Sequence, residues 1–294
     1  MLNLPDKVLI KEMCPRDGLQ SEGPGFIPTE KKIELCNRIS DAGYRYIEVT
    51  SFSHPKWIPQ LADSRLVYES IEKKPGITYA ALVPNVKAAE LALAIGVQEI
   101  VAIVSSSESH CKSNLNTTIA EGLDKVRQIA TMGLSAGAKV RAYISTSFGC
   151  PFEGHVPPQK VLDIALAMES YGIYEVSLGD TTGMATPASA YQVPRLLLEH
   201  LRTAGVAVHF HQNGGVEYAN VLASLQAGVT VIDSAIGGMG GCPYAPNSLG
   251  NVATERLVPM LESMGIATGI DTPKTLACAE YAHTLASMAR QPVA

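Results

Sequence analysis

The stretch EIVAIVSSS, residues 99–107, indicates the fold class. Its apolar residues run without a break, whereas a strand with one face in water alternates apolar and polar residues. The stretch VTVIDSAIGG, residues 229–238, has the same character. Continuous β-branched runs are typical of strands that are covered on both faces, so both stretches predict strands of a parallel sheet.

Strands and helices alternate along the chain on both sides of these runs. The pattern of apolar residues predicts strands at 7–13, 44–52, 78–84, 99–107, 139–149, 174–182, 206–212 and 229–238. Helical spacing predicts helices at 29–43, near 64–73, at 86–96, from 118 onward, and near 158–171, 187–203, 216–227 and 251–264. Thr118, with Glu121 three residues later, predicts a capping box at the start of the long fourth helix.

Eight strand-then-helix units in 294 residues predict an α/β fold of the (β/α)8 TIM-barrel class, spanning about residues 6–270. Residues 271–294 are expected to form an appended C-terminal helix that packs outside the barrel. Because no stretch has the composition of a linker, we expect a single domain over residues 1–294. A doubly wound open sheet is the alternative, but no G-x-G-x-x-G sequence follows any predicted strand.

Composition and charge disfavour several classes of function. The net charge is −5 and no cluster of five or more basic residues occurs, which argues against binding of nucleic acid or an anionic membrane. The first residues, MLNLPDKVLIKE, lack a secretory signal, and no apolar run reaches the roughly 20 residues of a membrane helix. Six cysteines without C-x-x-C spacing suit reduced thiols, so we expect a cytoplasmic protein.

Four polar residues are predicted to meet at the carboxyl ends of the strands, where barrels of this class carry their active sites. Asp17 follows the first strand, His209 and His211 share one face of the seventh, and Asn251 ends the loop after the eighth. Barrel closure makes these segments neighbours. One carboxylate, two imidazoles and an amide oxygen suit a divalent cation with two positions left for a substrate. For the two histidines alone, a hydrogen-bonded core pair is the alternative.

Other polar residues at the same end have two readings each. Arg16 either faces an oxygen that gains negative charge or pairs with a carboxylate. Glu48, Arg141 and Asp180 are either reactants or ion-pair partners behind the reactants. Cys242 lies in the glycine-rich stretch GGMGGCPYAPNSLGN, residues 237–251, which could close over a substrate and present the thiol as a proton donor or acceptor. An inert thiol is the alternative.

Five longer motifs carry a family resemblance. They are CPRDGLQSE at 14–22, YIEVTSFSHPKWIPQLAD at 46–63, VSLGDTTGMATP at 176–187, VHFH at 208–211 and GGMGGCPYAPNSLGNVATE at 237–255. Together they resemble 3-hydroxy-3-methylglutaryl-CoA (HMG-CoA) lyases, which belong to a superfamily of metal-dependent lyases and Claisen-condensing TIM barrels. The likeness runs from about residue 6 to residue 270 in unbroken register.

The resemblance implies an acyl-CoA substrate, cleavage of HMG-CoA to acetyl-CoA and acetoacetate in leucine degradation, a divalent metal (Mg²⁺ or Mn²⁺), and a homodimer. It implies that the metal ligands are Asp17, His209, His211 and Asn251. It further implies that Arg16 binds substrate, that Cys242 is the catalytic loop cysteine, and that Glu48 and Asp180 lie around the site. With the residues considered above, we predict Cys242, Arg16, Asp17, His209 and Glu48 as catalytic residues and Arg16, Arg141 and Asp180 as substrate contacts. Glu255 matches a family residue near the site, and Lys56 and Arg141 are candidate contacts for CoA.

The chain departs from the family pattern after the histidines. Family members commonly continue with Asp, whereas this chain has Gln212 and Asn213, and Cys14 stands where glycine is usual. The loss of a charge beside the metal leaves open a lyase for a different 3-hydroxy-3-alkylglutaryl-CoA or 3-hydroxyacyl-CoA. A catalytically silent binding relative is a further alternative, which the retained ligand set and Cys242 disfavour. The synthase branch usually carries a sizeable extra C-terminal region, and none follows residue 270.

Overall fold

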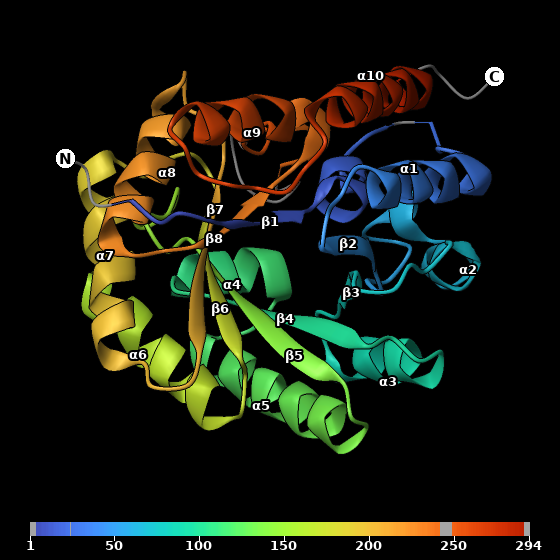
Figure 1. Ribbon diagram of the computed structural model, residues 1–294. Helices are drawn as coiled ribbons and strands as arrows, with labels where there is room; N and C mark the ends of the chain where they lie inside the picture. Colours follow the sequence, from blue (N-terminus) through green and yellow to red (C-terminus); the bar gives the residue numbers. More distant parts are fainter. Residues whose placement is uncertain (1–3, 24, 242–248, 291–294) are drawn as a thin grey trace.

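Eight parallel strands form a closed barrel in chain order, which confirms the predicted fold class (Figure 1). The computed structural model describes residues 4–23, 25–241 and 249–290. The strands are β1 (Leu9–Glu12), β2 (Tyr46–Ser51), β3 (Thr78–Leu82), β4 (Glu99–Ser105), β5 (Lys139–Ser145), β6 (Glu175–Asp180), β7 (Gly205–Phe210) and β8 (Val231–Ser234). Each lies within a stretch predicted to be a strand, apart from one residue at the start of β7.

Helices surround the barrel (Figure 1). They are α1 (Thr29–Asp41), α2 (Ser64–Ser70), α3 (Val86–Ala94), α4 (Glu108–Leu115), α5 (Ile119–Ser135), α6 (Pro158–Ser170), α7 (Pro187–His200), α8 (Val216–Ala227), α9 (Thr254–Ser263) and α10 (Thr272–Ala289). Three short turns are η1 (Cys14–Gly18), η2 (Pro59–Leu61) and η3 (Ile236–Gly238). The capping box of Thr118 and Glu121 is present at the start of α5.

Two helices differ from the sequence-based expectation. The sequence predicts no helix at α4, because its residues ESHCKSNL show little apolar periodicity; the helix is instead started by Ser107, whose side chain accepts a hydrogen bond from His110 N. The helix predicted at 251–264 begins only at Thr254. The residues before it pair with neighbouring strands instead, through bridges of Asn251 with His211 and of Ala253 with Ala235.

Closure of the barrel positions the candidate site. β1 pairs with β8 in parallel from Leu9 opposite Val231 to Glu12 opposite Ser234. β8 also pairs with β7, where His209 lies opposite Asp233. The turn η1 after β1, the end of β7 and the segment after β8 therefore lie side by side at one end of the barrel.

The appended helix is present and packs outside the barrel. α10 lies against α1, α9 and η3, at the top of the view in Figure 1. Tyr44 Oη and Thr275 Oγ1 are 3.1 Å apart and tie α10 to the start of β2. None of the described helices is both long and apolar enough to cross a membrane. The cysteines within the described residues are buried and free of disulfides, as expected; they are Cys14, Cys36, Cys111, Cys150 and Cys278.

Candidate active site

Asp17, His209 and His211 meet in a buried cluster at the carboxyl end of the barrel. One side-chain donor atom from each lies within 4.8 Å of the others. His209 is in β7 and His211 follows it by two residues, so the two rings share a face, with their centroids 5.2 Å apart. Asp17 comes from η1, which is a single turn of π-helix. The structure thus brings together three of the four predicted metal ligands, Asp17, His209 and His211.

Asn251 completes this cluster. Its Nδ2 donates hydrogen bonds to Asp17 Oδ2 at 2.6 Å and to the carbonyl oxygen of Met239 at 2.8 Å. Its Oδ1 is buried and has no hydrogen-bond partner among the described residues. A buried amide oxygen without a donor is costly, and a cation would satisfy it. The donor set of one carboxylate, two imidazoles and this oxygen therefore fits a divalent cation.

Arg16 is held between two carboxylates. Its Nε donates to Glu48 Oε1 and its Nη1 to Asp17 Oδ1. Glu48 Oε2 also accepts a hydrogen bond of 2.7 Å from the hydroxyl of Tyr143, whose ring lies 5.5 Å from the guanidinium carbon. Arg16 also lines the cavity described below, so it pairs with carboxylates and faces the site at once. The two readings of this residue are compatible.

Burial and neighbouring charges shift the pKa values of the three clustered residues in different directions. Burial alone would raise the pKa of Asp17, but Arg16 and His209 hold it well below its usual range. Burial likewise disfavours the charged form of His209, yet hydrogen bonds to Asp17 and Asp233 raise its pKa to about 9. Burial and the neighbouring His209 lower the pKa of His211 to about 4. In the absence of a cation, one charged imidazole thus lies between two carboxylates.

Arg141 lies behind the cluster, not against the substrate space. Its guanidinium is fully buried, and Nη2 donates to both oxygens of Asp233 at 2.7 and 2.8 Å. Nε donates to Glu175 Oε1 at 2.5 Å, and Nη1 to Tyr143 Oη at 3.1 Å. Because Arg141 is fully buried and does not line the cavity described below, the expected contact of Arg141 with substrate does not match its position. The other reading, an ion-pair partner behind the ligands, does.

Asp180 and Glu255 support the backbone around the site. Asp180 Oδ1 accepts hydrogen bonds from Met184 N and Ala185 N at 2.8 and 2.9 Å, while its Oδ2 is buried without a partner among the described residues. Burial raises the pKa of Asp180 to about 7. Glu255 Oε2 accepts from Gly237 N at 2.9 Å. Neither carboxylate lines the cavity, so a direct contact of Asp180 with substrate is not seen in this arrangement.

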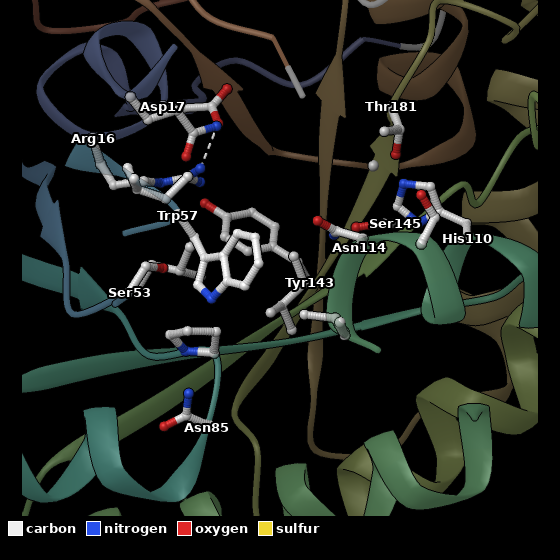
Figure 2. A pocket seen from close by; sticks show the side chains of 18 of the residues that line it. Arg16, Asp17, Ser53, Trp57, Asn85, His110, Asn114, Tyr143, Ser145 and Thr181 are labelled. Atoms are coloured by element: carbon white, nitrogen blue, oxygen red, sulfur yellow. Dashed lines mark hydrogen bonds and ion pairs between the residues drawn. The ribbon is translucent and has the colours of Figure 1, made fainter. Parts of the chain in front are cut away.

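A cavity of about 510 Å³ opens beside the cluster. Figure 2 shows Arg16 and Asp17 on one side of it, His110 and Thr181 on the other, and Tyr143 between them. His110 is fully buried, neither ring nitrogen has a hydrogen-bond partner among the described residues, and burial lowers its pKa to about 4. Sequence reasoning missed His110, although it follows the predicted strand at 99–107 by three residues, and this position was the signal that could have found it. Lys56 is exposed and does not line this cavity.

The glycine-rich segment packs directly on the ligands. Gly240 has φ +100°, and a Cβ there would lie 2.5 Å from Asn251 Nδ2 and 2.7 Å from the carbonyl oxygen of Asp17. Only glycine allows this approach without a shift. Cys242, the predicted catalytic cysteine, lies outside the described residues. Gln212, in contrast, is placed: its Nε2 donates to the carbonyls of Gly238 and Asn251 at 2.9 and 3.1 Å.

The barrel and the rim cluster define a TIM-barrel enzyme with a candidate metal centre. A protein-family model described as HMGL-like matches residues 7–281. The chain belongs to this family, and it is a carbon–carbon lyase.

Individual relatives agree with that assignment. The hydroxymethylglutaryl-CoA lyase YngG of Bacillus subtilis is 47% identical over 94% of this chain and 92% of its own length. The mitochondrial hydroxymethylglutaryl-CoA lyase of Homo sapiens is 43% identical over 96% of this chain and 86% of its own length. An HMG-CoA lyase from Acinetobacter baumannii, solved with coenzyme A and 3-methylmalate, is 35% identical with a TM-score of 0.92 over 98% of this chain and 93% of that one.

Proposed function

We propose that this chain cleaves HMG-CoA to acetyl-CoA and acetoacetate. The observation that carries the proposal is the buried group of Asp17, His209 and His211 beside a cavity that Arg16 also lines. The identity of 42–47% to HMG-CoA lyases from bacteria and mammals supports the same reaction. We propose that residues 1–294 act as one catalytic domain.

The reaction breaks the C2–C3 bond of the acyl group. The C3 hydroxyl loses its proton and becomes the ketone of acetoacetate, and the electron pair of the C2–C3 bond passes to a thioester enolate. A proton then returns to C2 and completes acetyl-CoA. Both the alkoxide and the enolate are costly in water, so the site must favour negative charge at two oxygens.

The chain's own residues suit these two tasks. The ligand residues are Asp17, His209, His211 and Asn251, and a divalent cation that they hold would lower the pKa of a hydroxyl that contacts it. Arg16, fixed by Glu48 and Asp17, supplies a permanent positive charge at the cavity wall for the enolate oxygen. Because both carboxylates restrain the guanidinium, little reorganisation is needed when charge develops.

We propose Cys242 as the group that protonates the enolate carbon. The proposal rests on the sequence alone, in which Gly240 and Gly241 precede this cysteine in the segment that leads to Asn251. A thiol matches the task because its ordinary pKa of roughly 8.5 lets it give a proton near neutral pH.

A lyase for another acyl group remains the second candidate. The feature that suggests it is the pair of amide residues Gln212 and Asn213 after the histidines. Gln212 ties the Gly238 and Asn251 carbonyls together, and Asn213 Nδ2 donates to the carbonyl of Gly183 at 2.7 Å. Neither residue lines the cavity. The amides therefore bear on loop packing more than on acyl choice, which favours HMG-CoA.

A coupled assay for acetyl-CoA tests the function. Purified protein with Mg²⁺ or Mn²⁺ should release acetyl-CoA from HMG-CoA faster than from longer 3-alkyl homologues. Loss of activity in His209→Ala, together with weaker Mn²⁺ binding, would support the ligand assignment. If the wild type neither binds Mn²⁺ nor cleaves any member of the panel, the silent relative is the correct reading.

Four finer properties are proposals as well. We propose Mg²⁺ or Mn²⁺ as the metal, because mixed oxygen and nitrogen ligands with open positions suit these ions. We propose a role in leucine degradation, a homodimer and a cytoplasmic location, as the family resemblance and the reduced cysteines suggest. Metal analysis of the purified protein, light scattering of its solutions and cell fractionation test the metal, the homodimer and the location in turn.

A further inference from the structure

A buried carboxylate lies directly behind the candidate metal ligand His209. Asp233, in β8, has Oδ2 3.4 Å from His209 Nδ1. On its other side, His209 Nε2 faces Asp17 Oδ2 at 3.7 Å. The ring therefore lies between a carboxylate of the cluster and one from the barrel interior. β7 and β8 place the two residues directly opposite each other in register.

Asp233 is itself held by two donors other than His209. Arg141 Nη2 contacts both carboxylate oxygens, and the Ser177 hydroxyl donates to Oδ2 at 2.8 Å. Asp233 and Arg141 are fully buried. Neither Asp233 nor Ser177 lines the cavity. A carboxylate fixed in this way is an obligatory acceptor at His209 Nδ1.

We propose that Asp233 is a positioning residue for His209: it accepts a hydrogen bond from Nδ1–H, fixes the ring, and directs the lone pair of Nε2 at the metal site. Arg141 and Ser177 hold Asp233 in place for this task. The inference rests on the proposed metal-binding role of His209. A histidine ligand whose second nitrogen donates to a carboxylate is held in one tautomer and one orientation, which strengthens binding of the metal.

The same guanidinium connects to the other half of the site. Arg141 Nη1 donates to Tyr143 Oη, and Tyr143 donates to Glu48, which holds Arg16. Tyr143 also presents its ring edge-on to His209, with centroids 5.7 Å apart. The buried guanidinium of Arg141 thus supports both His209, through Asp233, and Arg16, through Tyr143 and Glu48.

Asp233→Asn tests the proposal with little change in volume. The amide carries no charge, so it holds Nδ1–H more weakly than the carboxylate does, and when its NH2 faces His209 Nδ1 that nitrogen has to accept instead. That tautomer places Nε2–H at the metal position. We expect the Kd for Mn²⁺, measured by electron paramagnetic resonance, to rise about 10–100-fold. We also expect the downfield Nδ1–H resonance of His209 in ¹⁵N-histidine-labelled apoprotein, assigned by its loss in His209→Gln, to disappear.

Glu175→Gln is the matched control, because Glu175 contacts Arg141 but not Asp233. It should keep both the Mn²⁺ affinity and the Nδ1–H resonance. If Asp233→Asn does not fold, Ser177→Ala removes one donor to Asp233 and should shift the resonance in a smaller step. An unchanged Kd and an unchanged resonance in folded Asp233→Asn overturn the proposal. If the wild type binds no Mn²⁺, the metal site itself is refuted, and the resonance alone decides whether Asp233 positions His209.

Discussion

Asn251 Nδ2 lies 2.6 Å from Asp17 Oδ2, although the two residues are 234 positions apart in the chain. This contact directs Asn251 Oδ1 into a buried space where no described group bonds to it. Asn251→Ala removes that oxygen and the support of Asp17. We expect Mn²⁺ affinity to fall by at least about tenfold, by analogy with the loss of supporting contacts at metal sites. Titration calorimetry measures this. Asn213→Ala should bind Mn²⁺ as the wild type does, and equal affinity in both variants would contradict the role of Asn251.

Gly240→Ala should damage the site through space, not only through backbone strain. The added methyl group would meet Asn251 Nδ2 and the Asp17 carbonyl. Gly265 is the matched control, because it has φ +79° but open space around its Cβ position. Both variants should lose about 1–2 kcal/mol of stability from a positive φ. Only Gly240→Ala should also lose Mn²⁺ affinity and turnover. Similar turnover in the two variants would show that the close packing is unimportant.

Arg16→Gln should act on the chemical step. The side chain loses the charge that faces the enolate oxygen, and the removal of one such donor costs about 10²–10³ in kcat. The measurement is kcat at saturating Mn²⁺ and substrate, so that weaker binding does not obscure the result. Arg38→Gln, which removes an exposed ion pair with Glu34 on α1, should leave kcat unchanged. A normal kcat in Arg16→Gln would rule out the electrostatic role.

Cys242→Ser should separate binding from proton transfer. A hydroxyl gives up its proton far less readily than a thiol, so turnover should fall about 10²–10⁴-fold while binding of the acyl-CoA persists. Single-turnover kinetics and a binding assay with the same substrate measure the two quantities. Cys278→Ala removes a thiol of α10, away from the cavity lining, and serves as the control. Equal losses in both assays would point to a structural role of Cys242.

Glu12→Gln should change how stability depends on pH. Burial raises the pKa of Glu12 to about 8, although Ile236 N and Cys14 N both donate to it. Between the ordinary value of 4.5 and about 8, the folded state keeps a proton that the unfolded chain releases. Stability therefore falls as pH rises through this window, by up to about 1.4 kcal/mol per pH unit.

The glutamine variant carries no such proton and should escape this decline. Urea unfolding of both proteins from pH 5 to pH 9 measures the free energy of unfolding. The stability of Glu12→Gln relative to wild type should increase with pH up to about 8 and then level off. Parallel curves would show that Glu12 is ionised in the folded protein at neutral pH.

Sequence alone determined the features that depend on local spacing. The barrel was predicted from the continuous apolar runs at β4 and β8 and from the helical periodicity between strands. A strand that is buried on both faces needs apolar residues at consecutive positions, so this burial can be seen in the local sequence. The alternation of His209 and His211 placed both rings on one face. Order of the segments around a closed barrel was enough to bring Asp17 and Asn251 near them. The short helix α4 has no such apolar pattern and was not predicted.

Only the tertiary structure decided what each polar side chain contacts. Arg141 is the third residue of β5 and bonds to interior carboxylates, whereas Asp180 ends β6 but bonds to backbone amides. Asp233 gave a sequence signal, as a carboxylate at the end of an apolar strand, but its contact with His209 depends on the register of β7 with β8. Strand register and side-chain orientation depend on packing between segments that are distant in the chain, so they cannot be predicted from the local spacing of residues.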